Sequence, residues 1–158
     1  MIKILFVCTG NICRSPTADG VLALMVKQRN LDTVIEIDSA GIERYHVGEK
    51  PDLRSIQAAK TRGYDLEQLR ARQIGPTDFK TFDLILAMDQ GHFKQLQRAC
   101  PAQERHKIHL FLEFSSRFPN QSVPDPYYGA WDDFISVLDM VEDGCEGLLA
   151  HIETELLD

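Results

Sequence analysis

Residues able to do chemistry follow the first apolar run of the chain, in the segment FVCTGNICRSPT. Cys8 and Arg14 are separated by five residues, and Ser15 follows. A loop of this length can wrap one tetrahedral anion, because its backbone N–H groups, the dipole of the following helix and the arginine fork all attract negative charge. The same field stabilises a thiolate at Cys8, to which Ser15 can donate a hydrogen bond. Residues 8–15, called the oxyanion loop below, therefore predict an oxyanion bound above a sulfur nucleophile.

Other features of this loop favour a functional role over a structural one. Gly10 and Asn11 suit backbone torsions that most residues avoid, and Ser15-Pro16 begins a helix cleanly. The structural alternative is a buried cysteine at a strand end beside a surface arginine. It requires the glycine, the arginine, the serine and the helix start to occur together by chance. The loop also lacks the glycine-lysine-serine or glycine-lysine-threonine ending of a nucleotide-binding P-loop.

A candidate general acid lies far along the chain, in the segment VPDPYYGA. Asp125 stands between Pro124 and Pro126, which fix the backbone and hold its carboxyl group in one direction. Tyr127 and Tyr128 follow, and two exposed rings beside an acid would form the wall of a slot for a flat aryl phosphate. A proline-bounded turn with two half-buried tyrosines explains the segment equally well, so both interpretations stay open.

Composition and charge limit the protein that carries these residues. The 158 residues, 44% of them hydrophobic, fit one globular domain spanning 1–158. A formal net charge of -7 argues against general affinity for nucleic acid or an acidic membrane. The chain starts without the regions of a signal peptide and has no apolar run that could span a bilayer, so we expect a cytoplasmic protein.

The cysteines and histidines predict a site without metal or cofactor. Cys8, Cys13, Cys100 and Cys145 lack the paired spacing of a zinc site, and cytosolic thiols usually stay reduced. No histidine has a partner at metal-ligand spacing, so we interpret all five as surface residues or as core residues with satisfied hydrogen bonds. These histidines are His46, His92, His106, His109 and His151.

The elements that must position the reactive residues follow from hydrophobic periodicity. Apolar runs of strand length lie at 2–7, 34–37, 84–88 and 108–112. Helical patterns between them predict an α/β fold, a small doubly wound four-stranded parallel sheet flanked by helices on both faces. Ligands of such sheets bind beyond the carboxyl ends of the strands, where the oxyanion loop is expected.

Three helices are predicted with recognisable ends. The first begins at Ser15, whose side chain is the expected cap, and ends at Asn30. The second has Asp52 as its candidate cap and Gly63 as its stop. The third is a long amphipathic helix over residues 134–152.

These motifs resemble those of the low-molecular-weight protein tyrosine phosphatases. The signature VCTGNICRSP and the segment DPYYG carry the resemblance, and DSAGIERYHVGEKPDLRS, ARQI and FDLILAMD extend it over nearly the whole chain. The resemblance implies a phosphotyrosine phosphatase I-like fold. It also implies hydrolysis of phosphotyrosine and other aryl phosphate monoesters through a cysteinyl-phosphate intermediate, without a metal.

Carried over position by position, the resemblance implies roles for individual residues. Cys8 is the nucleophile, Arg14 the phosphate clamp and Asp125 the general acid, while Tyr45 joins Tyr128 in lining the aromatic slot. The residues expected to bind phosphate or substrate are Thr9, Gly10, Asn11, Ile12, Cys13, Ser15, Tyr45, Tyr127 and Tyr128. The expected partners are phosphotyrosine-containing proteins and a cognate tyrosine kinase, with no nucleic acid or membrane. The sequence leaves the substrate and oligomeric state open, with a monomer as our expectation.

One position departs from the family pattern. Many members carry a histidine two residues before the alanine of ARQ, in a hydrogen-bond network beneath the loop, and this sequence has Leu69 there. Leucine cannot hydrogen-bond, so the sequence does not say how Asn11, Ser15 and Ser39 are held. No catalytic group is removed.

Two other function classes use similar residues. Arsenate reductases of related architecture pass the oxidation from such a loop to further cysteines on a mobile segment. Here Cys100 lies beyond a predicted helix and Cys145 on an apolar helix stripe, so we rank the reductase below the phosphatase. A non-catalytic phosphotyrosine-binding module is the other alternative, but binding alone requires neither Cys8 nor Asp125.

Cys13 is not required by the phosphatase reaction. Peroxide first oxidises an accessible thiolate such as Cys8, and a neighbouring thiol can condense with the resulting sulfenic acid. Because the two cysteines are five positions apart on a curled loop, we predict a reversible Cys8–Cys13 disulfide. The alternative is that Cys13 only fills space beneath the loop.

Overall fold

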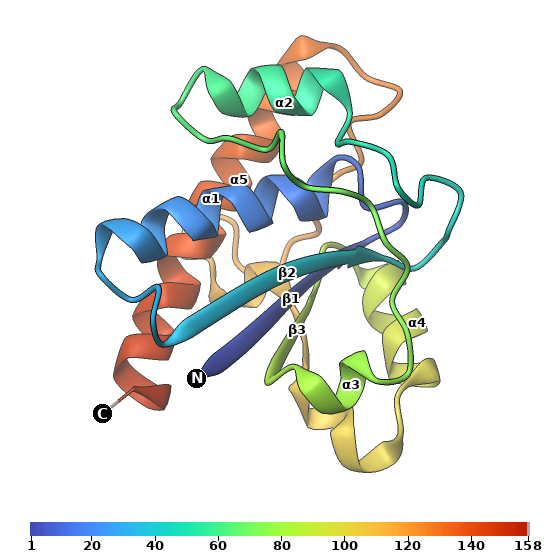
Figure 1. Ribbon diagram of the computed structural model, residues 1–158, viewed down its shortest axis with the longest axis vertical. Helices are drawn as coiled ribbons and strands as arrows, with labels where there is room; N and C mark the ends of the chain where they lie inside the picture. Colours follow the sequence, from blue (N-terminus) through green and yellow to red (C-terminus); the bar gives the residue numbers. More distant parts are fainter. Residues whose placement is uncertain (158) are drawn as a thin grey trace.

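A parallel sheet between two layers of helices forms the centre of the computed structural model, which describes residues 1–157 (Figure 1). The strands lie in the order β2-β1-β3-β4, and each neighbouring pair is parallel. They are β1 (Ile2–Cys8), β2 (Ile35–Gly41), β3 (Leu84–Ala87) and β4 (Ile108–Leu110). The predicted doubly wound α/β fold is therefore confirmed. Asp158, the last residue of the predicted domain, lies outside the described residues.

The helices cover both faces of the sheet. Helices α1, α2 and α5 lie on one face, and α3 and α4 on the other (Figure 1). Their bounds are α1 Arg14–Gln28, α2 Leu53–Lys60, α3 Asp78–Thr81, α4 Gln90–Ala99 and α5 Trp131–His151, with 3-10 helices η1 Ala102–Lys107 and η2 Phe111–Phe114 and a π-helical turn η3 Ile152–Leu156. Within residues 1–157, no helix combines the length and apolar character needed to cross a membrane.

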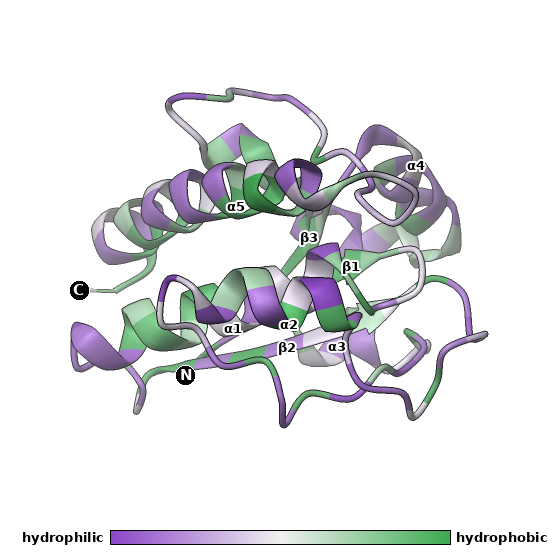
Figure 2. Cartoon of the chain, turned by 90° about the horizontal axis from the view of Figure 1, so that it is seen from above, coloured by the Kyte–Doolittle hydropathy of each residue, from purple (hydrophilic) through white to green (hydrophobic). Residues whose placement is uncertain are grey.

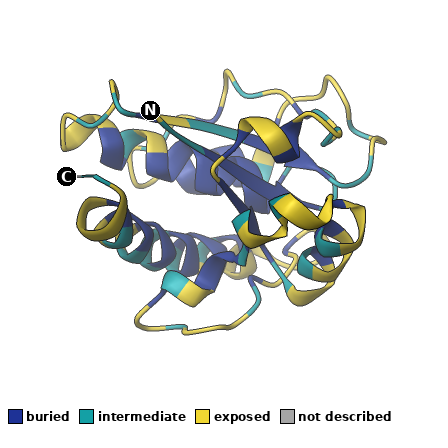
Figure 3. Ribbon diagram, turned by 90° about the horizontal axis from the view of Figure 1, so that it is seen from below, coloured by how far each residue is buried: buried dark blue, intermediate teal, exposed yellow. Residues whose placement is uncertain are grey.

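Alternate residues of the central strands pack into two separate hydrophobic cores. Ile4 and Phe6 of β1 face the core beneath α1 and α5, whereas Leu5 and Val7 face the core beneath α3 and α4. Figure 3 shows the sheet buried between helices whose outer surfaces are exposed. Hydrophobic and hydrophilic residues alternate along α5, as Figure 2 shows. Burial on both faces explains why β1 reads as a continuous apolar run.

Local signals set the ends of α2 as predicted. The Asp52 side chain accepts a hydrogen bond from the backbone N–H of Arg54 at 2.8 Å, which caps the helix. Gly63 follows the helix with a φ of 87°, a left-handed conformation that glycine adopts without steric cost. Both features depend only on neighbouring residues, which is why they could be predicted from the sequence.

The ends of the second and fourth predicted strands are wrong. β2 continues through Ser39 to Gly41 because its backbone pairs with β1 along its whole length. β4 stops at Leu110 because the chain turns into η2, and the ring of Phe111 packs edge-to-face on Phe6 with 5.3 Å between the ring centroids. Pairing and packing between distant segments therefore decide these boundaries.

Candidate active site

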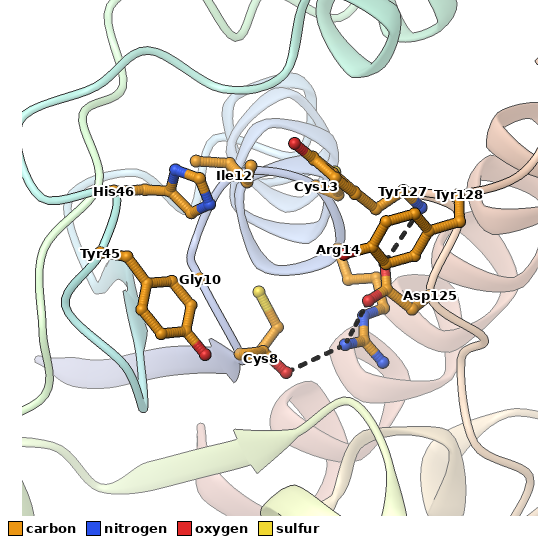
Figure 4. Close-up of a pocket in the computed structure, with 11 residues that line it drawn as sticks. Cys8, Gly10, Ile12, Cys13, Arg14, Tyr45, His46, Asp125, Tyr127 and Tyr128 are labelled. Carbon is orange, nitrogen blue, oxygen red and sulfur yellow. Dashed lines mark hydrogen bonds and ion pairs between the residues drawn. The ribbon is translucent and has the colours of Figure 1, made fainter.

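The carboxyl ends of β1 and β3 meet where the strand order reverses. Cys8 is the last residue of β1, and Asp89 follows β3 as the cap of α4. Because β2 and β4 lie to opposite sides of this pair, the connections leave in opposite directions and open a crevice. A pocket of about 510 Å³ lies at this point (Figure 4).

The pocket brings together residues from distant parts of the sequence. In Figure 4, Tyr45 and His46 lie on one side of the pocket, and Asp125 and the two neighbouring tyrosines on the other. Its lining residues are Cys8, Thr9, Gly10, Ile12, Cys13, Arg14, Tyr45, His46, Asp125, Tyr127 and Tyr128. Of the residues expected from the sequence to form the site, Asn11 and Ser15 do not line the pocket, and both are buried.

The glycine and asparagine of the oxyanion loop serve different purposes. Asn11 has a φ of 59°, in the left-handed region where asparagine is tolerated better than most residues. Gly10 does not adopt a positive φ, so the torsion predicted for it is wrong. A Cβ atom on Gly10 would instead lie 2.9 Å from His46 Cδ2, so glycine allows the His46 ring to lie this close to the loop.

A chain of hydrogen bonds connects Cys8 to the interior. The backbone N–H of Arg72 donates to Asn11 Oδ1 at 3.0 Å, and Asn11 Nδ2 donates to Ser15 Oγ at 2.8 Å and Ser39 Oγ at 3.0 Å. Ser15 Oγ lies 2.9 Å from Cys8 Sγ. Because Ser15 already accepts from Asn11, its own proton is available to the sulfur.

These hydrogen bonds show that Ser15 is not the helix cap expected from the sequence. They also show how the loop is held although Leu69 cannot hydrogen-bond. Helix α1 begins at Arg14 without a side-chain cap, and Ser15 Oγ is directed to the sulfur instead. Leu69 packs against the hydrophobic core. The loop is held through the backbone of Arg72, whose guanidinium pairs with Asp38 and Asp78 at 3.0 and 3.1 Å.

A buried carboxyl group lies beneath the same network and was not singled out from the sequence. Asp19, one turn along α1 from Ser15, is 6% exposed. Burial raises its pKa to about 7, a hydrogen bond with Ser39 opposes the rise, and the charge of Asp38 adds to it. Asp19 therefore keeps its proton to a higher pH than an exposed carboxyl group does.

Arg14 is buried and held by several oxygen atoms. Its NH1 donates to Asp89 Oδ2 at 2.9 Å and to the Val123 carbonyl at 3.0 Å, and its NH2 lies 3.4 Å from Thr9 Oγ1. Burial acts to raise the pKa of Asp89, but hydrogen bonds and charges from His92 and Arg14 outweigh it, and the net pKa is lowered. Asp89 was not singled out from the sequence, although a polar residue just beyond the apolar run 84–88 was a usable signal.

The carboxyl group of Asp125 faces Arg14 across the mouth of the pocket. Asp125 Oδ2 lies 3.8 Å from Arg14 NH2, and Oδ1 accepts a hydrogen bond from the backbone N–H of Tyr127 at 3.1 Å. Arg54 NH2 donates to the Tyr127 carbonyl at 3.0 Å and joins this segment to α2. The rings of Tyr127 and Tyr128 meet edge-on, and Tyr128 is 93% exposed, so the segment is more open than a turn with two half-buried tyrosines.

The cysteines fall into two groups. Cys13 lines the pocket, and burial raises its pKa to about 12 against a lowering hydrogen bond with Ser55. Cys100 and Cys145 are buried in opposite cores and do not line the pocket. All four are unpaired thiols in the part of the chain that is described. Thiols able to take over an oxidation from Cys8, as a reductase requires, are therefore limited at the pocket to Cys13.

The interpretation of the histidines is wrong at His92. It is buried, and its Nδ1 has no hydrogen-bond partner among the described residues. His46, half-buried, lines the pocket and pairs with Glu49. Residues 1–157 contain no cluster of histidine, cysteine or acidic side chains arranged to hold a metal ion.

Comparison with known proteins places this geometry in a family. The family model described as low molecular weight phosphotyrosine protein phosphatase matches residues 3–157. The chain belongs to this family. A low molecular weight phosphotyrosine protein phosphatase of Schizosaccharomyces pombe is 42% identical over 134 residues, which cover 84% of this chain and 85% of the relative. A low molecular weight protein-tyrosine-phosphatase of Streptomyces coelicolor is 38% identical over 157 residues, covering 98% and 95% of the two chains.

A solved structure of a protein tyrosine phosphatase has the same fold. The crystal structure of a protein tyrosine phosphatase from Entamoeba histolytica, with Hepes in the active site, matches with a TM-score of 0.94 and 40% identity. The match covers 98% of each chain. The resemblance to low-molecular-weight phosphatases stated from the sequence motifs is confirmed over the whole length that it was expected to cover.

Proposed function

We propose that this chain hydrolyses phosphotyrosine in proteins, and aryl phosphate monoesters in general, through a cysteinyl-phosphate intermediate on Cys8. The observation that carries the proposal is that Cys8 and Asp125 line one pocket, with Arg14 NH2 3.8 Å from the Asp125 carboxyl group. A nucleophile, an anion clamp and a proton donor are thereby available to one bound phosphate group.

In the first step, the Cys8 thiolate attacks phosphorus while the phosphate oxygens are bound by the loop N–H groups and Arg14. The sulfur–phosphorus bond forms as the bond from phosphorus to the tyrosine oxygen breaks, and Asp125 gives its proton to that oxygen. Arg14 and the N-terminal end of α1 stabilise the negative charge of the transferring phosphoryl group.

In the second step, a water molecule attacks phosphorus and gives its proton to the Asp125 carboxylate. The sulfur–phosphorus bond breaks, and the electron pair returns to Cys8 as a thiolate. Ser15, 2.9 Å from the sulfur, donates a hydrogen bond to that thiolate as it leaves. Inorganic phosphate is then released, and the starting protonation state of Asp125 is restored.

The walls of the pocket favour a flat leaving group. Tyr45 is 67% exposed on one side, and Tyr127 and Tyr128 stand on the other, so a phenyl ring attached to the bound phosphate lies between aromatic faces. A phosphoserine side chain has no ring to pack between these aromatic faces. We expect an aryl preference that decreases when Tyr45 or Tyr128 is replaced by alanine.

The cellular setting is part of the proposal. We infer that the partners are phosphotyrosine-containing proteins, including a tyrosine kinase whose action the enzyme opposes. A mechanism that depends on a reduced Cys8 fits the cytosol, where thiols are kept reduced. A monomer suffices for this chemistry, because one chain supplies every group named above.

Cys8→Ser tests the proposal, with Cys100→Ser as a matched control outside the pocket. Hydrolysis of a phosphotyrosyl peptide and of p-nitrophenyl phosphate is measured with EDTA present, and thiol-dependent arsenate reduction is measured in parallel. We expect turnover by the wild type and by Cys100→Ser, none by Cys8→Ser, retained binding of inorganic phosphate by Cys8→Ser, and no arsenate reduction. Hydrolysis by Cys8→Ser, or arsenate reduction exceeding phosphatase activity, would overturn it.

A further inference from the structure

A buried histidine lies behind the oxyanion loop and takes no part in the steps above. His92, in the first turn of α4, is 4% exposed. Its Nε2 lies 2.7 Å from Thr9 Oγ1, and its Nδ1 lies 3.2 Å from Asp89 Oδ1 without meeting hydrogen-bond geometry. Both neighbours of the ring are themselves in contact with Arg14. A solvent-free imidazole between two partners of the phosphate clamp calls for a role.

We propose that His92 is a positioning residue for Arg14, because together with Thr9 and Asp89 it closes a ring of polar contacts around the guanidinium group. Arg14 NH1 donates to Asp89 at 2.9 Å, and Arg14 NH2 contacts Thr9 at 3.4 Å. His92 joins the other side of these two residues through contacts of 2.7 and 3.2 Å. Both terminal nitrogens of Arg14 are thereby held before a phosphate binds.

The chemistry of the four groups gives the polar contacts of the ring one direction, although His92 Nδ1 and Asp89 Oδ1 do not meet hydrogen-bond geometry and Oδ1 accepts from the backbone N–H of His92 at 2.8 Å. The Asp89 carboxylate can only accept, so the nitrogen facing it, His92 Nδ1, carries the proton. His92 Nε2 is then an acceptor, and the Thr9 hydroxyl donates to it. The lone pairs of Thr9 Oγ1 remain free to accept from Arg14 NH2. The opposite tautomer would place the Nδ1 lone pair against a carboxylate.

The charge state of His92 suits this arrangement. Burial lowers its pKa to about 4, the charge of Arg14 contributes to the fall, and Asp89 and Asp125 oppose it. The imidazole is therefore neutral at physiological pH, as an acceptor at Nε2 requires.

The ring matters because Arg14 has a competing partner. Asp125 Oδ2 lies 3.8 Å from Arg14 NH2, on the same side as Thr9 Oγ1. When the contact with Thr9 is lost, Arg14 NH2 is free to pair with Asp125. That pairing withdraws a nitrogen from the phosphate and holds the general acid in its ionised form, in which it cannot protonate the leaving group. Loss of the ring therefore weakens phosphate binding and acid catalysis together.

The inference rests on the proposed function, and its test compares His92→Leu, which removes both nitrogens, with His92→Gln, which keeps an amide near Nε2. His106→Leu is the control, because His106 is exposed on η1 away from the pocket. For His92→Leu we expect kcat/KM for phenyl phosphate to fall about tenfold, as for loss of a buried hydrogen bond. The fall should be smaller for p-nitrophenyl phosphate, which needs less help from an acid. His92→Gln should regain most of the loss, and His106→Leu should equal the wild type.

A double-mutant cycle with Thr9→Val sharpens the test. If both residues act through one ring, the double variant His92→Leu/Thr9→Val is no worse than the poorer single variant. The proposal would be overturned if the activity losses of the two single variants multiply in the double variant. Equal losses for both esters, or failure of His92→Gln to recover activity, would also overturn it.

Two measurements remain decisive if His92→Leu does not fold or if turnover fails for another reason. The ¹⁵N NMR spectrum of the wild type should show His92 Nε2 as an unprotonated nitrogen, and a protonated Nε2 would overturn the ring. Inorganic phosphate binding to Cys8→Ser, with and without His92→Gln or Thr9→Val, tests the clamp without turnover. Thr9→Val should weaken that binding more than His92→Gln does, and equal affinities in all variants would contradict the proposal while leaving the role of Cys8 untouched.

Discussion

The hydroxyl oxygen of Ser15 lies 2.9 Å from the sulfur of Cys8, at the end of a hydrogen-bond chain that starts at the backbone of Arg72. Asn11 occupies the middle of the chain and uses both atoms of its amide, so the Ser15 proton is directed to the sulfur. The sulfur that we propose as the nucleophile is therefore connected to a residue 61 positions away from the loop asparagine.

We expect Ser15→Ala to reduce kcat by about 10- to 100-fold, because a hydrogen bond to a charged group contributes about 1.5–3 kcal/mol. The loss should be larger in breakdown of the cysteinyl-phosphate than in its formation, since the sulfur is then the leaving group. In rapid-mixing experiments with p-nitrophenyl phosphate, Ser15→Ala should show a burst of p-nitrophenol, because the cysteinyl-phosphate accumulates. The wild type should show a weaker burst or none. Ser116→Ala, an exposed serine, is the control, and unchanged turnover by Ser15→Ala would contradict the assigned hydrogen bond.

Asp125→Ala should slow phosphotyrosine hydrolysis by about 10²–10⁴-fold, the usual contribution of a general acid. Esters whose leaving groups need no proton should be affected much less, because they do not depend on that transfer. The measurement is the dependence of kcat/KM on the acidity of the leaving phenol, with Asp132→Ala as an exposed acidic control. Equal losses across all esters would mean that Asp125 has only a structural role.

The raised pKa of Asp19 predicts how stability depends on pH. Its pKa is about 7 in the folded protein and about 3.9 in an unfolded chain, so the folded state binds more protons between these values. The free energy of unfolding therefore falls as pH rises from about 4 to 7 on account of this group, by up to about 4 kcal/mol. Asp19→Asn is neutral throughout and should become progressively more stable than the wild type over that range.

Denaturant unfolding at pH 5 and pH 8 measures this difference, with Asp32→Asn as an exposed control. His92, whose pKa is lowered to about 4, has the opposite effect, because its unfolded form binds the extra proton and stability falls as pH decreases from about 6.5. The contribution of His92 to the free energy of unfolding is the same in the wild type and in Asp19→Asn, so it cancels when the two are compared. A stability difference that does not grow with pH would contradict the buried, proton-binding state of Asp19.

The proposed Cys8–Cys13 disulfide should form more efficiently as pH rises. Peroxide converts the Cys8 thiolate to a sulfenic acid, and the Cys13 thiol then condenses with it and releases water. Because the pKa of Cys13 is about 12, its thiolate is scarce at neutral pH and increases with pH. Activity recovered by dithiothreitol after peroxide should therefore increase from pH 6.5 to 8.5 in the wild type and stay low in Cys13→Ser.

Mass spectrometry offers a direct check of that disulfide. Both cysteines fall in one tryptic peptide between Lys3 and Arg14, so the disulfide makes this peptide lighter by two hydrogen atoms and resistant to alkylation. Cys100→Ser should recover as the wild type does. If the oxidised protein yields no such peptide, Cys13 only fills space beneath the loop.

Local chemistry in the sequence indicated the oxyanion loop, the candidate acid Asp125 and the two ends of α2. Cys8 and Arg14 lie on one loop between a strand and a helix, and Asp125 stands between two prolines, so residues within a few positions were enough to single out each of them. The parallel sheet followed from apolar runs that alternate with helical patterns. These features require no knowledge of which distant segments meet.

Only the tertiary structure decided which groups surround the reactive atoms. Asp89 contacts Arg14 across 75 positions, and His92 contacts Thr9 across 83. Such pairs exist because β1 and β3 are neighbours in the sheet, which places the start of α4 beside the oxyanion loop. Hydrophobic periodicity indicates which face of an element is buried but not which element covers that face. The partners of Arg14 therefore could not be predicted without the order of the strands in the sheet.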